Sequence, residues 1–363
     1  MDSRVREHAE VIVDHSTSVE AGDDVVVSGS PEAEDLVVAV MELLGERGAN
    51  PHVSMGSDRA MRAFLRAADP EEFEPPAHTE ALFEASDVLI SIRAASNVNE
   101  RSDVDPEVNA AHSATRKAVR DVAMDRRWVG TQYPASGNAQ KAEMSTEAYE
   151  EFVFDAVLKD WEAQRAHQEQ LVEVLADADG VRIRSGEATD VLLSIAGNVV
   201  RNDYAEHNLP GGEVFTAPVV DSVEGEVLFD KPVIVQGREV LDARLVFEGG
   251  EVVEHDAGKN GEVLTSLLET DEGARRLGEL GIGMNRDIDR FTYNMLFDEK
   301  MGDTVHMAIG MAYEDTVGEG NERNDSAVHT DMIVDMSEDS TIEVDGEVVQ
   351  RDGTFRFEDG FEE

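Results

Sequence analysis

No cysteine occurs among the 363 residues of the chain. This absence excludes disulfide bonds, thiolate nucleophiles and thiolate metal ligands. The sequence also lacks an apolar run long enough to span a membrane, and its first residues, MDSRVREHAEVIVDHS, lack the apolar core of roughly 7 to 15 residues that marks a signal peptide. We therefore expect a soluble protein that resides in the cytoplasm.

Basic residues are scarce as well. Lysine and arginine together number 31, and only six of these are lysine, whereas aspartate and glutamate number 79, which gives a formal net charge of -48. A field of this sign and size repels nucleic-acid phosphates and anionic lipid surfaces. We expect neither a nucleic-acid partner nor a membrane partner.

The acidic residues are spread along the whole chain and are not gathered in a terminal tail. Dense surface carboxylates of this kind keep a protein hydrated and dissolved in concentrated salt. The composition is therefore typical of a protein from a halophile, and a moderately acidic protein from a mesophile is the alternative that it leaves open.

The first half of the sequence predicts alternating strands and helices. Short β-branched or apolar runs occur at 24–28 (DVVVS), 52–55 (HVSM) and 87–92 (DVLISI). After the first run, apolar residues recur at helical spacing from Leu36 to Leu44, and Gly48 ends the predicted helix. This alternation favours a doubly wound, Rossmann-like parallel sheet of the α/β class.

A nucleotide site is not expected in this α/β region. The segment SGS at 28–30 lies between a strand and a helix, but no G-x-G-x-x-G or P-loop pattern is present. Glu32, Glu34 and Asp35 fall in the first helical turn, where their charge would oppose a bound phosphate.

The sequence changes character near residue 178. Residues 146–178 predict one long charged helix, and short β-rich runs separated by glycines follow from 181. We therefore predict a Rossmann-like α/β domain at 1–178 and a β-rich α+β domain at 179–363. His8, His15 and His167 fall on charged helices and are expected at the surface.

Four short segments of the second domain each place a candidate metal ligand on an apolar element. Alternation along DTVHMAIG puts His306 on the face opposite Val305 and Met307, and residues two apart in AVHTDMIVD share a face. The other two segments are NLPGGEVFTAP and RLGELGIG. The candidate ligands are Glu213, Glu279, His306, His329 and Asp331.

Three carboxylates and two imidazoles suit Zn, Co or Mn. The carboxylates exceed what one tetrahedral shell needs, which suggests two ions bridged by a carboxylate and a water. Taken singly, each residue has an ordinary alternative as a solvated surface acid or a hydrogen-bonded histidine. The residues alone make a metal site plausible and no more.

The ordered segments NLPGGEVFTAPV, LGELGIGMNRDIDRF, FDEKMGDTVHMAIGMAY and DSAVHTDMIVD closely resemble the thermophilic leucyl aminopeptidases of the aminopeptidase T and PepS type. The resemblance is strong over about 208–335. It implies a metallo-aminopeptidase that hydrolyses the N-terminal residue from peptides with a free N-terminus, using a water activated at two divalent metal ions. It also implies a homodimer.

The family's metal ligands fall, by motif position, on the same five residues, and its catalytic tyrosine falls on Tyr313 in GMAYED. Glu279 would bridge the ions or accept the proton of the attacking water. The chain departs from what the resemblance leads us to expect at Thr330, where a large aromatic residue is expected in many relatives, and in the acidic loop 314–325. Both departures leave the preferred substrate open.

Two other functions compete with this interpretation. A dinuclear hydrolase could act on phosphate esters or on a non-peptide amide or ester, although the net charge disfavours anionic substrates. A non-catalytic protein of the same fold could bind a small molecule through its α/β domain.

The charge predicts that stability depends on salt. Repulsion among carboxylates is weakly screened at about 0.01 M salt, where the Debye length is about 30 Å, and strongly screened at about 1 M, where it is about 3 Å. The midpoint of thermal unfolding, followed by circular dichroism, should therefore rise over this range of KCl. Sucrose, which does not screen charge, is the control. A midpoint that is unchanged or lower in molar KCl would contradict the prediction.

Overall fold

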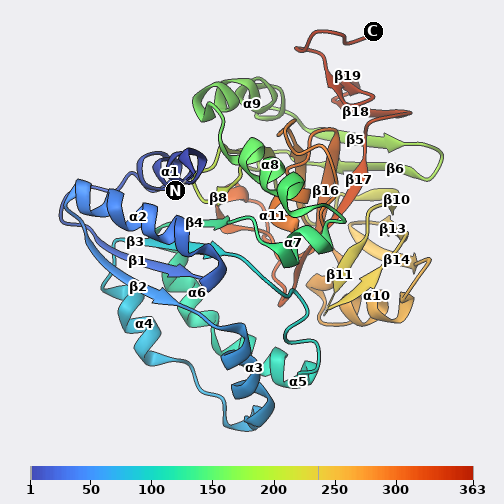
Figure 1. The fold of residues 1–363 in the computed structure, drawn as a ribbon. Coiled ribbons are helices and arrows are strands. Elements are labelled where there is room, and N and C mark those ends of the chain that lie inside the picture. Colours follow the sequence, from blue (N-terminus) through green and yellow to red (C-terminus); the bar gives the residue numbers. More distant parts are fainter. Residues whose placement is uncertain (1, 236, 363) are drawn as a thin grey trace. The chain divides into compact units, whose positions relative to one another are not determined.

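The computed structural model describes residues 2–235 and 237–362. They form two compact units, the first made of Met1–Lys159 with Ala205–Gly211 and the second of Asp160–Tyr204 with Gly212–Glu363 (Figure 1). Within the described residues, no helix combines the length and apolar character needed to cross a bilayer.

The first unit contains a parallel sheet with the strand order β2-β1-β3-β4-β8. The chain passes from β1 to β2 on one side and then to β3 on the other side of β1, so the sheet is doubly wound. The runs predicted at 24–28, 52–55 and 87–92 all lie in it. The strands are β1 (Asp24–Gly29), β2 (Asn50–Met55), β3 (Val88–Arg93), β4 (Arg127–Gln132) and β8 (Asn208–Leu209).

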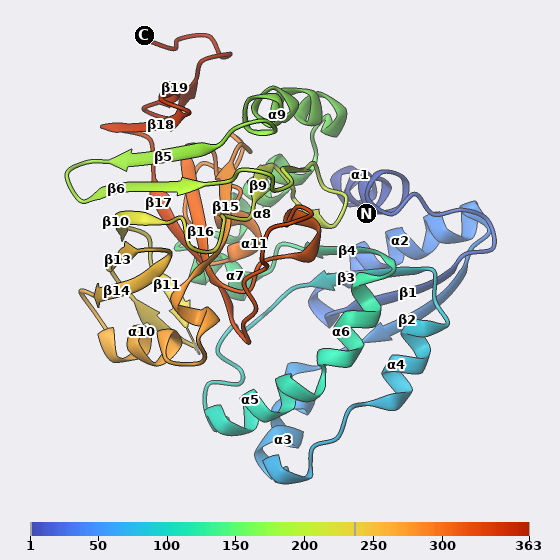
Figure 2. The ribbon, with the colours of Figure 1, turned by 180° about the vertical axis from the view of Figure 1, so that it is seen from behind.

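Helices cover both faces of this sheet, with α1 and α2 on one face and α4 and α6 on the other (Figure 2). Helix α2 ends as the sequence predicts, because Gly48 takes a φ of 75° at its C-cap. The helical segments are α1 (Ser3–Glu10), η1 (Val11–Ser16), η2 (Pro31–Ala33), α2 (Glu34–Arg47), α3 (Asp58–Ala67), η3 (Pro70–Glu72), α4 (Ala77–Glu84), α5 (Pro106–Thr115), α6 (Lys117–Met124), α7 (Ser136–Lys141) and α8 (Thr146–Val157).

His8 is not at the surface, so that sequence prediction was wrong. Its side chain is fully buried on α1, and its Nε2 lies 2.9 Å from Thr131 Oγ1. Burial lowers the pKa of His8 to about 3. Although the sequence of α1 is highly charged, Val5, His8 and Ala9 are buried, because a short helix needs few inward-facing residues to pack. His15 and His167 are partly exposed.

The second unit contains an antiparallel sheet with the order β14-β13-β10-β6-β5-β18-β19-β20, a second antiparallel sheet with the order β17-β16-β15-β9-β7, and the hairpin β11-β12. The strands of the first sheet are β5 (Gly180–Ser185), β6 (Thr189–Ser194), β10 (Glu224–Phe229), β13 (Ala243–Glu248), β14 (Glu251–Asp256), β18 (Ser340–Val344), β19 (Glu347–Arg351) and β20 (Thr354–Phe355). The remaining strands are β7 (Arg201–Asp203), β9 (Glu213–Thr216), β11 (Val233–Val235), β12 (Arg238–Val240), β15 (Leu277–Gly283), β16 (Thr304–Gly310) and β17 (His329–Asp335).

The helical segments of this unit are α9 (Trp161–Leu175), α10 (Gly261–Leu268), η4 (Gly273–Arg275), α11 (Met295–Asp298) and η5 (Glu314–Thr316). A doubly wound parallel sheet followed by a mixed α+β region is the fold class that the sequence predicts, and the structure confirms it.

The division between the units lies after Lys159, whereas the sequence predicts a boundary near 178. The single long helix predicted over 146–178 is wrong, because the chain forms α8 and α9 with a break between them. The Asp160 side chain accepts a hydrogen bond from the backbone N–H of Ala163 at 3.0 Å and starts α9 as an N-cap. Leu171 and Leu175 then pack into the core of the second unit, which assigns α9 to that unit.

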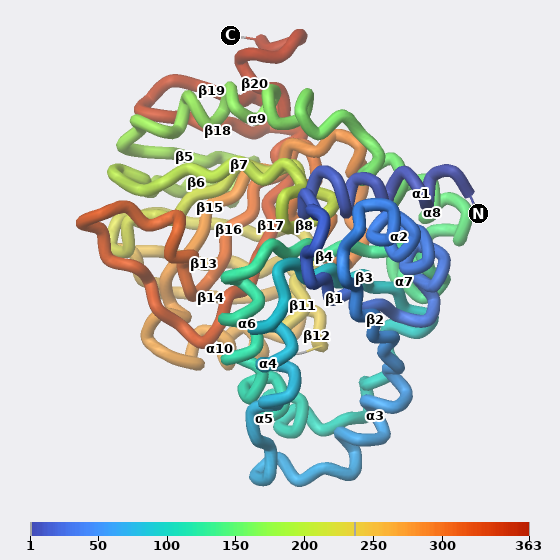
Figure 3. Tube along the Cα trace, turned by 90° about the vertical axis from the view of Figure 1, so that its left-hand side faces the viewer, coloured from blue at the N-terminus to red at the C-terminus, as the bar shows by residue number. Residues whose placement is uncertain are grey.

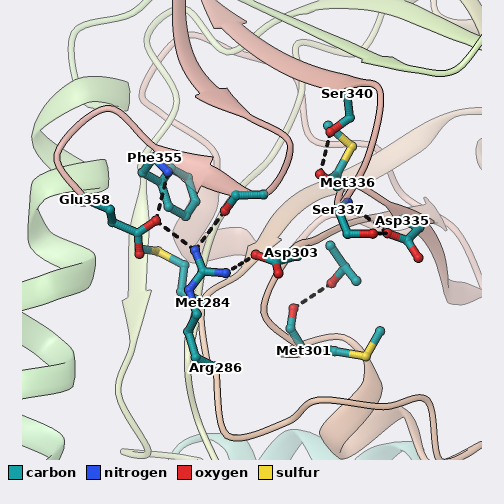
Figure 4. Close-up of polar contacts among 12 residues, drawn as sticks. Met284, Arg286, Met301, Asp303, Asp335, Met336, Ser337, Ser340, Phe355 and Glu358 are labelled. Atoms are coloured by element: carbon teal, nitrogen blue, oxygen red, sulfur yellow. Dashed lines mark hydrogen bonds and ion pairs between the residues drawn. The ribbon is translucent and has the colours of Figure 1, made fainter. Parts of the chain in front are cut away.

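Arg286 ties three segments of the second unit together (Figure 4). Its guanidinium donates to the carboxylates of Asp303 and Glu358 and to the carbonyl oxygen of Gly353, the latter two at 2.8 Å. Glu358 also accepts the backbone N–H of Phe355 at 2.8 Å. The loop after β15, the turn before β16 and the C-terminal segment are thereby held together.

Candidate metal centre

The sheet β17-β16-β15-β9-β7 carries all five predicted ligands. Strands β15, β16 and β17 run side by side (Figure 3). Glu213 starts β9, Glu279 lies on β15 and His306 lies on β16, while β17 carries both His329 and Asp331. The structure therefore brings together residues that the sequence separates by up to 118 positions, which is the interval between Glu213 and Asp331.

The two faces of this sheet have different characters. The face opposite the ligands is apolar, and it contributes Val214, Leu280, Ile282, Val305, Met307, Ile309, Met332 and Val334 to the core of the second unit. On the ligand face, His306 is paired with Gly281 across the strands, and Glu213 is paired with Gly283. Glycines leave room for ligand side chains, since a Cβ at Gly281 would lie 2.0 Å from the His306 ring.

The ligand atoms form two groups that share Glu279. In the first group, His306 Nε2 lies 3.1 Å from Glu279 Oε1 and 3.2 Å from Glu213 Oε2. In the second group, His329 Nε2 lies 3.5 Å from Asp331 Oδ1 and 4.0 Å from Glu279 Oε2. Each group offers three ligand atoms within 4.8 Å of one another.

These donors fit a divalent cation. Ligands at about 2.0–2.2 Å from a tetrahedral ion lie about 3.3–3.6 Å from one another, close to the spacings within each group. Glu213 Oε2, Glu279 Oε2 and Asp331 Oδ1 are buried and have no hydrogen-bond partner among the residues that the structure describes. Buried carboxylate oxygens of this kind are costly unless a cation neutralises them.

Each histidine has one nitrogen available as a ligand. His329 Nδ1 lies 2.7 Å from the carbonyl oxygen of Met311, so it carries the proton that this oxygen accepts and leaves Nε2 facing the carboxylates. His306 presents Nε2 to Glu213 and Glu279, and its Nδ1 is buried.

The electrostatics of the cluster show how strongly it attracts positive charge. Burial raises the pKa values of Glu213 and Glu279. Burial alone would lower the pKa values of the histidines, but the carboxylates outweigh it and raise them to about 9 for His306 and about 10 for His329. Against the effect of burial, His329 holds the pKa of Asp331 at about 2. A metal ion bound to these carboxylates would compete with the protons of the two histidines.

Tyr313 lies beside the second group. It follows β16, and its ring centroid is 4.9 Å from that of His329 and 6.5 Å from that of Phe215. Burial, together with the charges of Glu279 and Asp331, raises the pKa of its hydroxyl. The phenol is therefore protonated at neutral pH and can donate a hydrogen bond.

Sequence reasoning missed the cation that the structure places in this cluster. Lys300 is fully buried, and its Nζ lies 3.0 Å from Glu213 Oε1, 3.9 Å from Asp203 Oδ2 and in contact with Glu299. Burial would lower its pKa, but these three carboxylates raise it well above the usual value. The available signal was a lysine a few residues before a predicted ligand strand in a chain with only six lysines.

Side chains of helix α9 donate hydrogen bonds to the backbone next to this cluster. Gln168 Nε2 donates to the carbonyl oxygens of Glu213 and Asp203 at 3.0 and 2.9 Å, and Gln164 Nε2 donates to the carbonyl oxygen of Met284 at 3.1 Å. Two glutamine side chains therefore hold the backbone of β7, β9 and the end of β15.

Replacing Gly281 by alanine should displace the His306 ring and weaken metal binding by about 10- to 100-fold, as the loss of a ligand's support does, and overpacking should cost about 1–3 kcal/mol of stability. Metal content after dialysis and thermal unfolding measure the two effects. Gly180→Ala on β5 is the matched control, because its nearest neighbour in the described structure would be 3.9 Å from the new Cβ. Unchanged metal affinity in Gly281→Ala would contradict the proposed geometry.

Comparisons with known proteins identify relatives of this chain. The chain is 27% identical to "Aminopeptidase 2" of Geobacillus stearothermophilus, with 98% of each chain covered. The solved structure of wild-type AmpT from Thermus thermophilus matches with a TM-score of 0.87 and 25% identity over 98% of this chain and 99% of that one. A 2,5-dihydroxypyridine dioxygenase from Pseudomonas putida KT2440 shares the fold, with a TM-score of 0.63 and 15% identity over 99% of each chain.

The model of one protein family, described as thermophilic metalloprotease (M29), matches residues 1–356. This match covers nearly the whole chain and both units. The resemblance predicted from four ordered sequence segments is thereby confirmed, and the chain belongs to the M29 family of thermophilic metalloproteases.

Proposed function

We propose that the protein is a metallo-aminopeptidase whose active centre is the ligand face of the sheet β17-β16-β15-β9-β7. Glu213, Glu279 and His306 would hold one divalent ion, and Glu279, His329 and Asp331 would hold a second. The observation that carries this assignment is that two three-ligand groups share Glu279 and contain three buried carboxylate oxygens without hydrogen-bond partners among the described residues.

Oxygen and nitrogen donors without sulfur suit Zn, Co or Mn. When bound, a pair of such ions polarises a carbonyl group and lowers the pKa of a water molecule. The protein's contribution is to hold the donors in place. Burial raises the pKa of Glu213, and Lys300 opposes this rise by contacting the oxygen that does not face His306.

Two side chains have roles in moving or donating protons. Glu279 lies where the two ligand groups meet, so its carboxylate can take the proton that a water loses when it attacks the peptide carbonyl. Tyr313 keeps its proton and would donate a hydrogen bond to the developing oxyanion, an interaction worth a few kcal/mol in comparable sites.

Four further features are proposals, three of which rest on the composition and pattern of the sequence, while the homodimer rests on the family resemblance. They are zinc as one of the candidate ions, a homodimeric assembly, a cytoplasmic location and adaptation to high salt. Peptides with a free N-terminus are the expected substrates, in keeping with the name of the full-length relative from Geobacillus stearothermophilus.

Metal removal tests the function directly. In molar salt, the purified protein should contain about two divalent ions per chain and hydrolyse a leucyl arylamide. A chelator should abolish hydrolysis, and Zn, Co or Mn should restore it. The N-acetylated arylamide and an aryl phosphate, assayed in parallel, should be inert. A metal-free protein that hydrolyses nothing would contradict the proposal, cleavage of the blocked arylamide would indicate an endopeptidase, and cleavage of the phosphate would favour the esterase alternative.

Replacing Glu279 by glutamine removes the proton acceptor and the shared ligand charge while it preserves the shape of the side chain. We expect kcat for the leucyl arylamide to fall by at least about 10²-fold, with metal content reduced and far-ultraviolet circular dichroism unchanged. Glu343→Gln is the matched control, because Glu343 is also a strand residue of the second unit but pairs with Arg184 at 2.9 Å, outside the cluster. Full activity of Glu279→Gln would remove Glu279 from the mechanism.

A further inference from the structure

A small cavity lies against the second ligand group. Its volume is about 240 Å³, and His329 and Asp331 form part of its lining. Pockets for drug-sized ligands measure roughly 300–1,000 Å³, so this cavity suits a single amino-acid residue. All of its lining residues belong to the second unit.

Most of the cavity wall is apolar. Ile234 on β11 has 41% of its surface exposed. The rings of Phe291 and Tyr293 lie 4.9 Å apart. The wall consists of Pro232, Val233, Ile234, Phe291, Tyr293 and Met295. An aliphatic side chain placed there would leave water for an apolar surface.

Besides Asp331, a second carboxylate interrupts this apolar wall. Asp298 also lines the cavity, although only 1% of its surface is exposed. Its Oδ1 accepts hydrogen bonds from the backbone N–H and the hydroxyl of Thr292, both at 2.7 Å. Its Oδ2 is buried and makes no hydrogen bond of its own within residues 2–235 and 237–362. Burial raises the pKa of this carboxyl to about 7, against the hydrogen bonds that Thr292 and the backbone N–H of Asn294 give it. A buried acceptor left unpaired is costly, so this oxygen is suited to a donor that arrives with a ligand.

The chemistry of the substrate identifies that donor. The first residue of a peptide presents a terminal amine, a side chain and a carbonyl oxygen. The carbonyl oxygen only accepts hydrogen bonds, and a side chain that suits an apolar wall has no N–H or O–H group. The terminal amine is then the group that can donate to Asp298.

We propose that this cavity is the subsite for the first residue of the peptide, with the apolar wall receiving its side chain and Asp298 Oδ2 accepting a hydrogen bond from its terminal amine. This inference rests on the proposed function, because it assumes an N-terminal peptide residue as ligand. It assigns Asp298 to the recognition of the free N-terminus.

Leucinamide and 4-methylpentanamide test the assignment, because they differ only in the α-amine. Ligand-observed NMR titration of the metal-free protein, and competitive inhibition of the metal-loaded enzyme, give the ratio of their affinities. The native protein should prefer leucinamide. In Asp298→Asn this preference should fall by roughly tenfold or more, since a hydrogen bond to a charged group contributes that much to affinity. Asparagine retains the oxygen that Thr292 contacts, so the fold should persist, and thermal unfolding checks it.

Asp345→Asn is the matched control, because Asp345 likewise accepts backbone N–H groups, from Asp179 and Gly180, but does not line the cavity. It should leave the preference unchanged. An unchanged preference in a folded Asp298→Asn protein would overturn the role of Asp298. A loss confined to ligands with a lysine or arginine side chain would overturn it too, because it would assign Asp298 to side-chain recognition.

The apolar wall is tested through Ile234→Asp, which should shift kcat/KM from leucyl towards lysyl arylamide by roughly tenfold. Val253→Asp changes another exposed strand residue of the second unit, 45% exposed on β14, and should leave this ranking unchanged. If Ile234→Asp leaves the ranking of leucyl and lysyl arylamides unaltered, the side chain of the substrate's first residue binds elsewhere. If the native protein hydrolyses no arylamide at all, the proposed function fails, whereas normal native hydrolysis with these variants unaffected overturns only the subsite.

Discussion

Buried negative charge is the constraint on which the second unit depends. Glu213, Glu279 and Asp331 lie largely out of water on one face of a sheet, where an uncompensated carboxylate is costly. The protein supplies one fixed cation, Lys300, and directs it to Glu213. The other carboxylates face histidines whose pKa values they raise, so positive charge must be present there as protons or as metal ions.

The sheet that carries these buried carboxylates accommodates them because its two faces differ in composition. One face packs into a continuous apolar core, which stabilises the strands, and the other is left with ligands and glycines. Gly281 shows the coupling most directly, since the His306 ring occupies the space that any side chain at 281 would need. Gln168 on α9 then fixes the backbone of Glu213 by a hydrogen bond to its carbonyl oxygen. The ligand positions are thus set by packing that lies outside the cluster.

The fold alone does not decide the chemistry. A dioxygenase from Pseudomonas putida KT2440 has a similar fold at 15% identity, so the arrangement of strands is compatible with unrelated reactions. The features that we propose for peptidase chemistry are local: a pair of ligand groups sharing Glu279, a protonated Tyr313 beside them, and a cavity that joins apolar walls to Asp298. Function in this chain therefore depends on a small number of side chains on a widely used scaffold.

The sequence by itself determined the parallel strands of the first unit. It also determined the alternation that puts His306, His329 and Asp331 on the ligand faces of their strands. Both features follow local periods of two and 3.6 residues. Ordered segments also identified the family. The tertiary structure alone decided that α9 belongs to the second unit, that Lys300 is buried among carboxylates and that Asp298 lines a cavity. A lysine or aspartate in a polar stretch has the same local pattern whether it is solvated or buried, and only the long-range pairing of strands determines which groups surround it.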